Sequence, residues 1–275
     1  MNSIYTVCWN ITSNCNENCK FCFRKKCKEN SLKQNKEILD NLLKIKIHKL
    51  TFSGGEALLY DNLFKLVDYA KQNDPSIILS LTSNGKVIDK YLMEKIIQKF
   101  DIITFSIDST KEDINKKIGR GKEHLSKVIE LLNICNNKID IKINTVVSKY
   151  NITELENIYE IIKKYNVSRW KILRYYPIRD SIKYKDEFYI DEKVSDNVKN
   201  IINNIKRKSN IIINYDDIKE FNTSYFNIYP DGSIENNKSE VIGNLLNTPI
   251  NEILRRKKSE IINNYSRNFK KNKVK

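Results

Sequence analysis

Residues 4–12, IYTVCWNIT, and residues 15–22, CNENCKFC, decide how the rest of this chain is interpreted. The first stretch is rich in β-branched and aromatic residues, which favour a β-strand. The second places Cys15, Cys19 and Cys22 at spacings of three and two residues, with Phe21 directly before the last cysteine. A strand that leads into a cluster of cysteines predicts a metal centre at the end of that strand.

Beyond the cysteines, short β-rich runs alternate with longer runs of helical period. We expect five more strands, at residues 49–52, 77–81, 102–107, 139–147 and 167–173, with helices between them. This alternation predicts parallel βαβ units. Six units are too few to close an eight-stranded barrel. The predicted fold class is therefore α/β, a partial (βα)6 TIM-like barrel with an appended C-terminal α+β region.

The alternation ends near Tyr176, and this point divides the predicted architecture. Residues 1–175 are expected to form the barrel core, and residues 176–275 a C-terminal extension with a basic tail. In the extension we expect a helix near residues 195–206, a hairpin that turns at residues 230–232, and a last helix from Ile250.

Composition excludes some classes of protein. The chain has 275 residues, 40% of them hydrophobic, and no apolar run approaches the roughly 18 residues of a membrane span. We therefore expect a cytoplasmic protein without a membrane partner. The formal charge is +15, but the lysines are interleaved with acidic residues rather than gathered in one stripe. That pattern does not predict a nucleic-acid partner.

Four of the six cysteines, namely Cys15, Cys19, Cys22 and Cys27, fall in a span too short for a disulfide framework. Three thiolates suit an iron–sulfur cluster. A structural zinc site needs a fourth ligand, which Cys27 could supply. A zinc-binding interaction module without catalytic activity therefore stays open as an alternative.

The spacing Cys-x3-Cys-x-aromatic-Cys directly after a first strand resembles the signature of the radical S-adenosyl-L-methionine (SAM) superfamily. The resemblance implies a [4Fe-4S] cluster held by Cys15, Cys19 and Cys22. Its fourth iron, without a protein ligand, would take the amino and carboxylate groups of SAM. The protein then contributes binding, orientation and exclusion of water, while the cofactors carry the radical chemistry.

Further motifs resemble the SAM-binding segments of this superfamily. Residues 53–56, SGGE, resemble its GGE motif, in which adjacent glycines admit the methionyl group and the glutamate accepts a hydrogen bond from the ammonium. Arg120, in the stretch IGRG, is the candidate for a clamp on the SAM carboxylate. Ordinary turn chemistry is the alternative for the strand-end residues of this set. The cofactor-binding residues are expected to be Gly54, Gly55, Glu56, Ser83, Asn84, Ser106 and Arg120.

Several stretches resemble viperin-like radical SAM nucleotide dehydratases: Cys22-Phe23, 49–56 (KLTFSGGE), 118–121 (IGRG), 142–147 (KINTVV) and 169–171 (RWK). The likeness implies a nucleoside triphosphate substrate, CTP, UTP or GTP. Lysines that point from barrel strands into a pocket also need an anion to offset the cost of burial. The alternative for each lysine is that it points outward and is solvated. The substrate-binding residues are expected to be Lys49, Ser53, Lys142, Asn144, Arg169 and Lys171.

The same resemblance implies the reaction of a lyase. A deoxyadenosyl radical takes the hydrogen from C4′ of the ribose, and water leaves from C3′. The product is a 3′-deoxy-3′,4′-didehydro nucleotide, a chain terminator in antiviral or antiphage defence. Tyr225, in the stretch Ser224-Tyr225-Phe226, is the catalytic candidate of the extension, which would complete the substrate pocket. A reduced flavodoxin- or ferredoxin-type protein would supply the electron.

Other radical SAM activities remain open. The likeness to the dehydratases fades after Leu173, and no motif marks the late arginine that holds phosphate in that family. A peptide-modifying enzyme usually carries extra cysteines near its C-terminus, whereas Cys135 is the last cysteine here. A tRNA-modifying enzyme would make use of the +15 charge and show salt-sensitive RNA binding.

Overall fold

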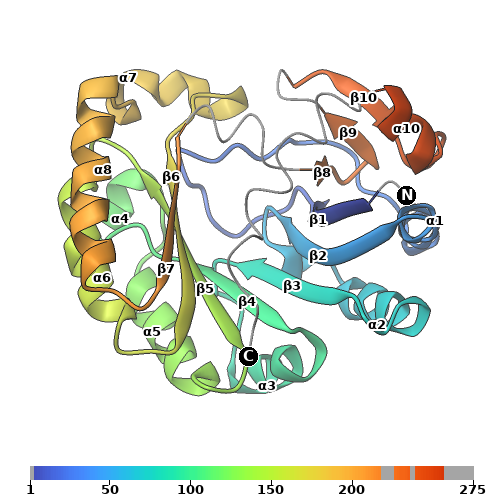
Figure 1. Ribbon diagram of the computed structural model, residues 1–275, viewed down its shortest axis with the longest axis horizontal. Helices are drawn as coiled ribbons and strands as arrows, with labels where there is room; N and C mark the ends of the chain where they lie inside the picture. The colour runs from blue at the N-terminus through green and yellow to red at the C-terminus, as the bar shows by residue number, and fades with distance from the viewer. Residues whose placement is uncertain (1–2, 218–225, 236–238, 257–275) are drawn as a thin grey trace. The chain divides into compact units, whose positions relative to one another are not determined.

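The computed structural model describes residues 3–217, 226–235 and 239–256, which are drawn as ribbons in Figure 1. The chain packs into two compact units. The first unit comprises Met1–Asn14, Lys26–Ser80 and Lys219–Lys275, and the second comprises Cys15–Lys25 and Leu81–Ile218. Strand β3 (Ile78–Ser83) runs across the division between them in the chain. The partition expected from the sequence, at residue 175, stays a prediction.

The first unit is built on a mixed sheet with the strand order β10-β9-β8-β1-β2. Strand β1 (Ser3–Thr12) is parallel to both β2 (Lys46–Gly54) and β8 (Phe226–Ile228). Strand β9 (Ser233–Glu235) is antiparallel to β8 and to β10 (Val241–Asn244). The helices of this unit are α1 (Leu32–Leu43), η1 (Ala57–Leu59), α2 (Leu63–Asn73) and α10 (Ile250–Arg256).

The second unit carries four parallel strands in the order β4-β5-β6-β7. They are β4 (Ile102–Ser106), β5 (Asp140–Val147), β6 (Val167–Arg174) and β7 (Ile212–Asp216). Its longer helices are α3 (Lys90–Lys99), α5 (His124–Cys135), α6 (Leu155–Ile162) and α8 (Glu192–Arg207). The shorter ones are α4 (Glu112–Ile118), η2 (Ile152–Glu154), η3 (Arg179–Tyr184) and α7 (Lys185–Phe188).

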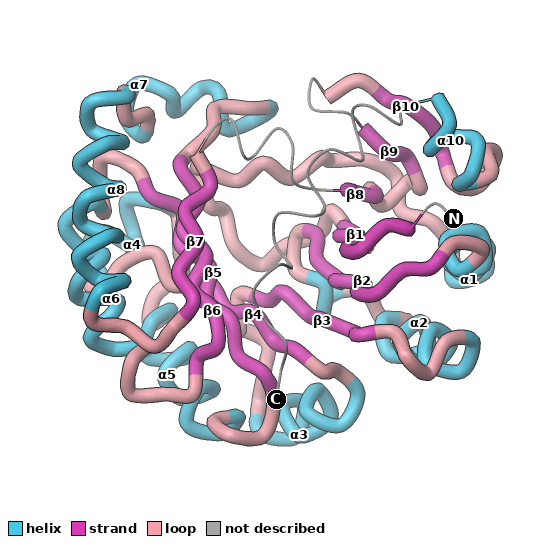
Figure 2. The backbone as a smooth tube through the Cα atoms, in the orientation of Figure 1, coloured by secondary structure: helices cyan, strands magenta, loops and turns pink. Residues whose placement is uncertain are grey.

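Burial alternates along β5 and along most of β6, so the two faces of these strands have different environments. In β5, Ile141, Ile143, Thr145 and Val147 are buried, while the residues between them are only half-buried. Figures 1 and 2 show α5, α6 and α8 along one side of β5, β6 and β7. Side chains of neighbouring strands on the opposite face are the more polar ones, so this face is available for a site.

Most expected elements are present with shifts of a few residues at their ends. The hairpin expected at residues 230–232 joins β8 and β9, and the last helix begins at Ile250 as predicted. Strand β7 was missed, since the irregular stretch that includes η3 and α7 interrupts the period before α8. Strand β7 is parallel to β6, so the parallel pattern continues past Tyr176.

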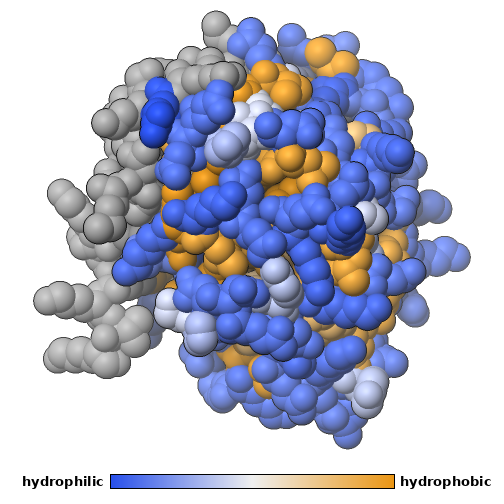
Figure 3. All heavy atoms as spheres, turned by 90° about the vertical axis from the view of Figure 1, so that its right-hand side faces the viewer, coloured by the Kyte–Doolittle hydropathy of each residue, from blue (hydrophilic) through white to orange (hydrophobic). Residues whose placement is uncertain are grey.

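Polar side chains cover most of the described surface that faces the viewer in Figure 3. Figure 3 shows apolar side chains in small groups between hydrophilic ones on the side that lies to the right in Figure 1. Scattered apolar groups of this kind are normal on a folded protein. Among the residues that the structure describes, no helix is both long and apolar enough to traverse a bilayer.

Candidate active site

The cysteine loop of the second unit follows β1 in the chain and is fastened by its backbone. Lys20 donates its N–H to the carbonyl of Ile118 at 3.0 Å, and Cys22 donates to the carbonyl of Cys19 at 3.1 Å. Gly119 ends α4 with φ +87°, and a Cβ there would lie 2.3 Å from the carbonyl oxygen of Asn18. Only glycine admits this close approach in this conformation.

The side chains between the cysteines are held as well. Asn84 donates from Nδ2 to Oδ1 of Asn16 at 2.7 Å, and the same Nδ2 lies 3.9 Å from Sγ of Cys15. Glu17 accepts the N–H of Gly121 at 2.6 Å, and its other oxygen lies 3.5 Å from the ammonium of Lys86. The loop is therefore shaped by the protein's own hydrogen bonds.

An open hollow of about 500 Å³ adjoins this loop. It brings together two of the residues expected from the sequence, the cluster ligand Cys15 and the SAM ligand Arg120. Its lining consists of Cys15, Asn16, Glu17, Asn18, Arg24, Gly119, Arg120 and Gly121.

Arg120 is held by a residue that the sequence did not single out. Its Nε and one terminal nitrogen lie 2.8 and 2.7 Å from the same carboxylate oxygen of Asp108, which is buried. The other oxygen of Asp108 accepts the N–H of Val146 at 2.8 Å. Burial lowers the pKa of Arg120, but the charges of Cys19 and Asp108 raise it more, so the pKa lies above its usual value. Arg120 is thus a fixed cation beside the cysteine loop.

The strand-end residues Ser83, Asn84 and Ser106 have local partners. Ser83 accepts the N–H of Gly85 at 3.0 Å, and Asn84 accepts that of Lys86 at 2.9 Å, as the alternative of turn chemistry predicted. The carbonyl of Ser106 lies 2.8 Å from Nε2 of His124. Burial, aided by the charge of Arg120, lowers the pKa of His124 to about 4, so this imidazole is neutral and donates to Ser106.

In the first unit, Gly54 and Gly55 lie in close contact with the backbone at the end of β1. A Cβ at Gly54 would lie 2.4 Å from the carbonyl oxygen of Thr12, and one at Gly55 would lie 2.1 Å from that of Asn14. The N–H groups of Gly55 and Glu56 donate to these same two carbonyls at 2.8 Å. The two glycines therefore fasten the segment that leads into the cysteine loop, and Glu56 is buried beside them.

Lys49 and Ser53 both lie on β2, also in the first unit. They occupy the face opposite the buried Leu50 and Phe52 and are only half-buried. Their partners in the parallel register are Thr6 and Asn10 of β1.

The expected substrate residues of the second unit form two rows on one face of β5 and β6. Lys142 is in register with Arg169, and Asn144 with Lys171. Burial lowers the pKa of Lys142; Asp140 opposes this shift, whereas the cations Arg169 and Lys171 add to it. The ammonium of Lys171 lies 2.6 Å from the carboxylate of Asp216. Tyr225, the catalytic candidate, lies outside the described residues.

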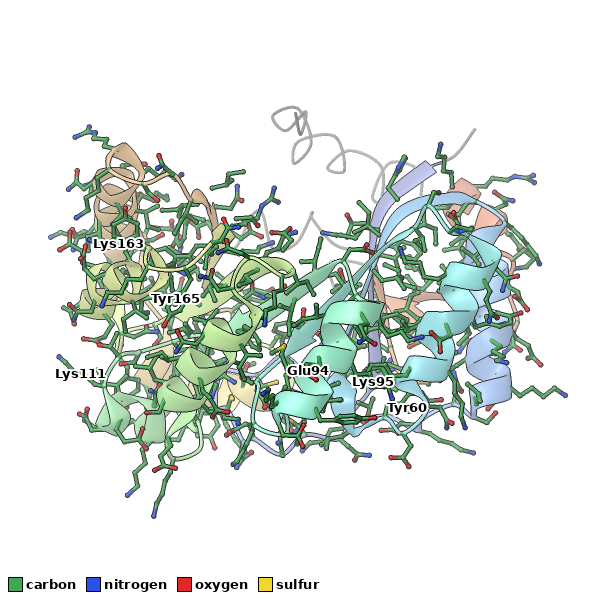
Figure 4. The ribbon with its side chains drawn as sticks, turned by 90° about the horizontal axis from the view of Figure 1, so that it is seen from below. Tyr60, Glu94, Lys95, Lys111, Lys163 and Tyr165 are labelled. Atoms are coloured by element: carbon green, nitrogen blue, oxygen red, sulfur yellow. The ribbon has the colours of Figure 1, made fainter. Side chains whose placement is uncertain are left out.

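These cations differ from the lysines on the outer surface. Lys163 pairs with Glu160 of its own helix at 2.5 Å, and Lys111 pairs with Glu154 at 3.2 Å. Figure 4 labels both lysines, at the outer edge of the second unit. The Lys163–Glu160 pair is solvated, and the exposed Lys111 offsets the charge of the buried Glu154, so neither lysine requires a ligand.

Residues 9–162 match a family model with the description "Radical SAM superfamily". The chain belongs to the radical SAM superfamily. The match spans the cysteine loop, the Gly-Gly-Glu motif and Arg120 in one continuous stretch. The superfamily uses a [4Fe-4S] cluster and SAM, as expected from the cysteines.

Within the superfamily, the likeness to nucleotide dehydratases is confirmed by curated relatives with that name. An S-adenosylmethionine-dependent nucleotide dehydratase of Oncorhynchus mykiss is 33% identical over 178 residues, which is 62% of this chain and 51% of the relative. Another, of Flammeovirga pacifica, is 30% identical over 207 residues, or 70% of either chain. The chain spans about half the length of the first relatives that it matches.

Solved structures confirm the fold class. SuiB of Streptococcus suis bound to SAM is similar with a TM-score of 0.76 at 15% identity, over 91% of this chain and 65% of SuiB. The enzyme anSMEcpe with bound AdoMet is similar with a TM-score of 0.74 at 17% identity, over 92% of this chain and 80% of anSMEcpe. The fold is thus the α/β, partial TIM-like barrel of radical SAM proteins with a C-terminal extension.

The residues present fit an iron–sulfur cluster. Burial raises the pKa of the Cys19 thiol to about 12, while the charge of Arg120 lowers it. Metal binding would release this proton, since the thiolate is the ligand. In the described part of the chain, no three Cys, His, Asp or Glu side chains gather around one point as they would for a single ion. A cubane cluster does not require this, because each thiolate binds a different iron.

Proposed function

We propose that this protein is a radical SAM nucleotide dehydratase. Its reaction would convert a nucleoside triphosphate, CTP, UTP or GTP, to the 3′-deoxy-3′,4′-didehydro form. The observation that carries the proposal is the group of cations on β5 and β6, where burial and two further cations disfavour the charge of Lys142. A polyphosphate is the ligand that would relieve this repulsion. The names of the curated relatives support the same substrate class.

The cofactor-binding roles follow from the loop and its surroundings. Cys15, Cys19 and Cys22 would hold the cluster, and the bound SAM supplies a 5′-deoxyadenosyl radical that takes one hydrogen atom from the substrate. Arg120, already oriented by Asp108, would bind the carboxylate of SAM. The remaining assignments come from the superfamily motifs, with Glu56 as acceptor for the methionyl ammonium. They comprise Gly54, Gly55, Glu56, Ser83, Asn84 and Ser106.

The proposed substrate-binding residues would bind different parts of the nucleotide. Lys142, Arg169 and Lys171 would bind phosphate oxygens, and the amide of Asn144 would hydrogen-bond the nucleotide. For Lys171 the phosphate would compete with Asp216, its present partner. The assignment of Lys49 and Ser53 rests on the family motif 49–56. Tyr225 is proposed to complete the reduction, and residues 176–275 to complete the substrate pocket.

The biological setting follows from the product. A nucleotide without a 3′-hydroxyl terminates a growing chain, so the proposed role is antiviral or antiphage defence. The protein would act in the cytoplasm and take electrons from a reduced flavodoxin- or ferredoxin-type donor.

The test uses protein reconstituted with iron and sulfide without oxygen, then reduced and mixed with SAM and one nucleoside triphosphate at a time. We expect one triphosphate to raise the release of 5′-deoxyadenosine well above the rate with SAM alone. Release at the background rate with every triphosphate would refute the dehydratase proposal and leave the superfamily assignment intact. Stimulation by a tRNA or a peptide instead would point to a different radical SAM activity.

A further inference from the structure

Strand β7 extends the polar rows of β5 and β6 by one strand. Asn214 is in register with Lys171, which is in register with Asn144, which is in turn in register with Ser106 of β4. Residues in register on parallel strands point to the same face. Four polar side chains on four strands therefore share one row.

The orientation of β7 is confirmed by its contacts on both faces. The hydroxyl of Tyr215 lies 2.9 Å from that of Ser195 on α8, so Tyr215 points toward the helices. Asp216 pairs with Lys171 at 2.6 Å and so lies on the opposite face. Because Asn214 and Asp216 are two residues apart, as Lys142 and Asn144 are, Asn214 faces the same side as the proposed substrate residues.

The amide oxygen of Asn214 is buried and has no hydrogen-bond partner within the part of the chain that the structure describes. A buried acceptor without a donor costs free energy, and most such atoms in native proteins have a partner. An oxygen acceptor cannot bind a phosphate oxygen, so the missing partner must be an O–H or N–H group. The hydrogen-bond donor for this oxygen would therefore be a part of the ligand other than the phosphates.

The position of Asn214 along β7 indicates which part of the nucleotide would lie beside its amide oxygen. Lys142 and Arg169, two of the proposed phosphate ligands, lie one row closer to the amino ends of their strands than Asn214 does. Two residues along a strand span roughly 6–7 Å, about the step from a phosphate to the ribose. Lys171, in the same row as Asn214, would then bind the phosphate next to the ribose, so the donor beside Asn214 at this level is a ribose hydroxyl.

We propose that Asn214 is a further substrate-binding residue, whose amide oxygen accepts a hydrogen bond from the 2′-hydroxyl of the nucleotide. The 3′-hydroxyl is not chosen, because it leaves as water in the proposed reaction. This inference rests on the proposed function and deepens it, since it makes Asn214 a selector of ribonucleotides over 2′-deoxynucleotides.

The experiment combines substitutions of Asn214 with removal of the 2′-hydroxyl from the nucleotide. The dissociation constants of the stimulating triphosphate and of its 2′-deoxy form are measured on the reconstituted, SAM-bound protein by anaerobic calorimetry. For the unchanged protein we expect about tenfold weaker binding of the 2′-deoxy form. For Asn214→Ala the two constants become equal, because the ribonucleotide loses its partner and the deoxynucleotide loses nothing. Asn214→Asp keeps an acceptor and keeps the preference, although both ligands bind more weakly.

Thermal stability separates ligand binding from a structural role. Because the burial of an acceptor without a partner costs free energy, its loss leaves the melting temperature of the nucleotide-free Asn214→Ala variant unchanged or raises it. The exposed Asn203→Ala on α8 is the matched control and keeps both the preference and the stability. A preference retained in Asn214→Ala, or a lower melting temperature with equal loss for both ligands, would overturn the inference alone. If the unchanged protein binds no triphosphate, the proposed function fails and the inference with it.

Discussion

The cysteine loop and the polar rows of β5–β7 lie in the same unit but satisfy their polar groups in opposite ways. In the loop, Asn16 and Glu17 each have a partner within the protein. In the rows, Lys142 lies beside two other cations, and the amide oxygen of Asn214 has no hydrogen-bond partner among the described residues. The protein thus shapes the proposed cluster site by itself, whereas the proposed substrate face keeps charge and polarity that a bound nucleotide would balance.

The largest effect is expected from Cys19→Ala, which removes one of the three proposed cluster ligands. After anaerobic reconstitution, iron should fall from about four per chain to well below one, and the brown absorbance should be lost. Cleavage of SAM should become undetectable.

Cys27→Ala is the matched control, since Cys27 is a half-buried thiol a few residues further along the chain. It should keep the full iron content. Loss of metal in both variants, with tightly held zinc instead of iron in the unchanged protein, would contradict the cluster and favour a zinc site with Cys27 as its fourth ligand.

Lys142→Met tests the proposed substrate face. It should weaken nucleotide binding and stabilise the nucleotide-free protein. Nucleotide affinity, measured by calorimetry, should fall about tenfold to a hundredfold, since a charged hydrogen bond is lost. The nucleotide-free protein should become more stable by about 1 kcal/mol, because a buried cation is replaced by an apolar side chain.

The stability gain of Lys142→Met should decrease as the pH rises. The lowered pKa of Lys142 means that its charge opposes folding at neutral pH. The stability gain of Lys142→Met should be full there and should shrink as the pH rises from the lowered pKa toward the value of an ordinary lysine. The exposed Lys138→Met is the control and should change neither property. Lower stability of Lys142→Met without nucleotide would show that Lys142 has a structural partner.

Glu17→Ala tests whether the loop is as self-sufficient as its contacts indicate. The change leaves the N–H of Gly121 without its acceptor and should cost about 1–3 kcal/mol of unfolding free energy in denaturant titrations. Iron should also pass to a chelator faster. The exposed Glu130→Ala on α5 should change neither quantity measurably. Equal behaviour of the two variants would mean that Glu17 does not hold the loop.

The smallest effect is expected from Lys20→Ala. Lys20 lies in the same loop, but its ammonium is 3.5 Å from the carboxylate of Glu187 and both side chains are partly exposed. Such surface pairs contribute little, so unfolding free energy should change by less than about 0.5 kcal/mol. A loss as large as that of Glu17→Ala would remove the distinction between buried and exposed contacts of the loop.

The sequence was most informative where chemistry needs fixed spacing. Three cysteines in one loop, and glycines next to a glutamate, predicted the superfamily because few other structures need those residues in that order. The period of two also predicted that Lys142 and Asn144 share a face, and the strand register confirms this. Such features are local in the chain and can be found without knowledge of tertiary contacts.

Contacts between distant segments could not be predicted in this way. Asp108 orients Arg120 from another strand end. Its stretch, Ser-Ile-Asp-Ser, was interpreted by resemblance as a SAM-contacting segment, with turn chemistry as the alternative, and not as a source of a partner for Arg120. Strand β7 is five residues long and follows α8, and the irregular stretch with η3 and α7 before that helix interrupts the βα period, so no periodic signal marked the strand. Both depend on tertiary packing, and an acidic residue that ends a strand, as Asp108 does, is the signal that could have pointed to a partner for Arg120.

The measurement that tests the central claim most directly uses a triphosphate labelled with deuterium at C4′. Reduced, reconstituted protein is incubated with SAM and the labelled nucleotide, and the 5′-deoxyadenosine is analysed by mass spectrometry. The proposed dehydratase transfers the label, so the released 5′-deoxyadenosine should carry one deuterium. The nucleotide product should lack that deuterium and one hydroxyl, which gives it the mass of the unlabelled triphosphate less one water. Unlabelled 5′-deoxyadenosine with an unchanged nucleotide would contradict the assignment of the ribose as the target of this site.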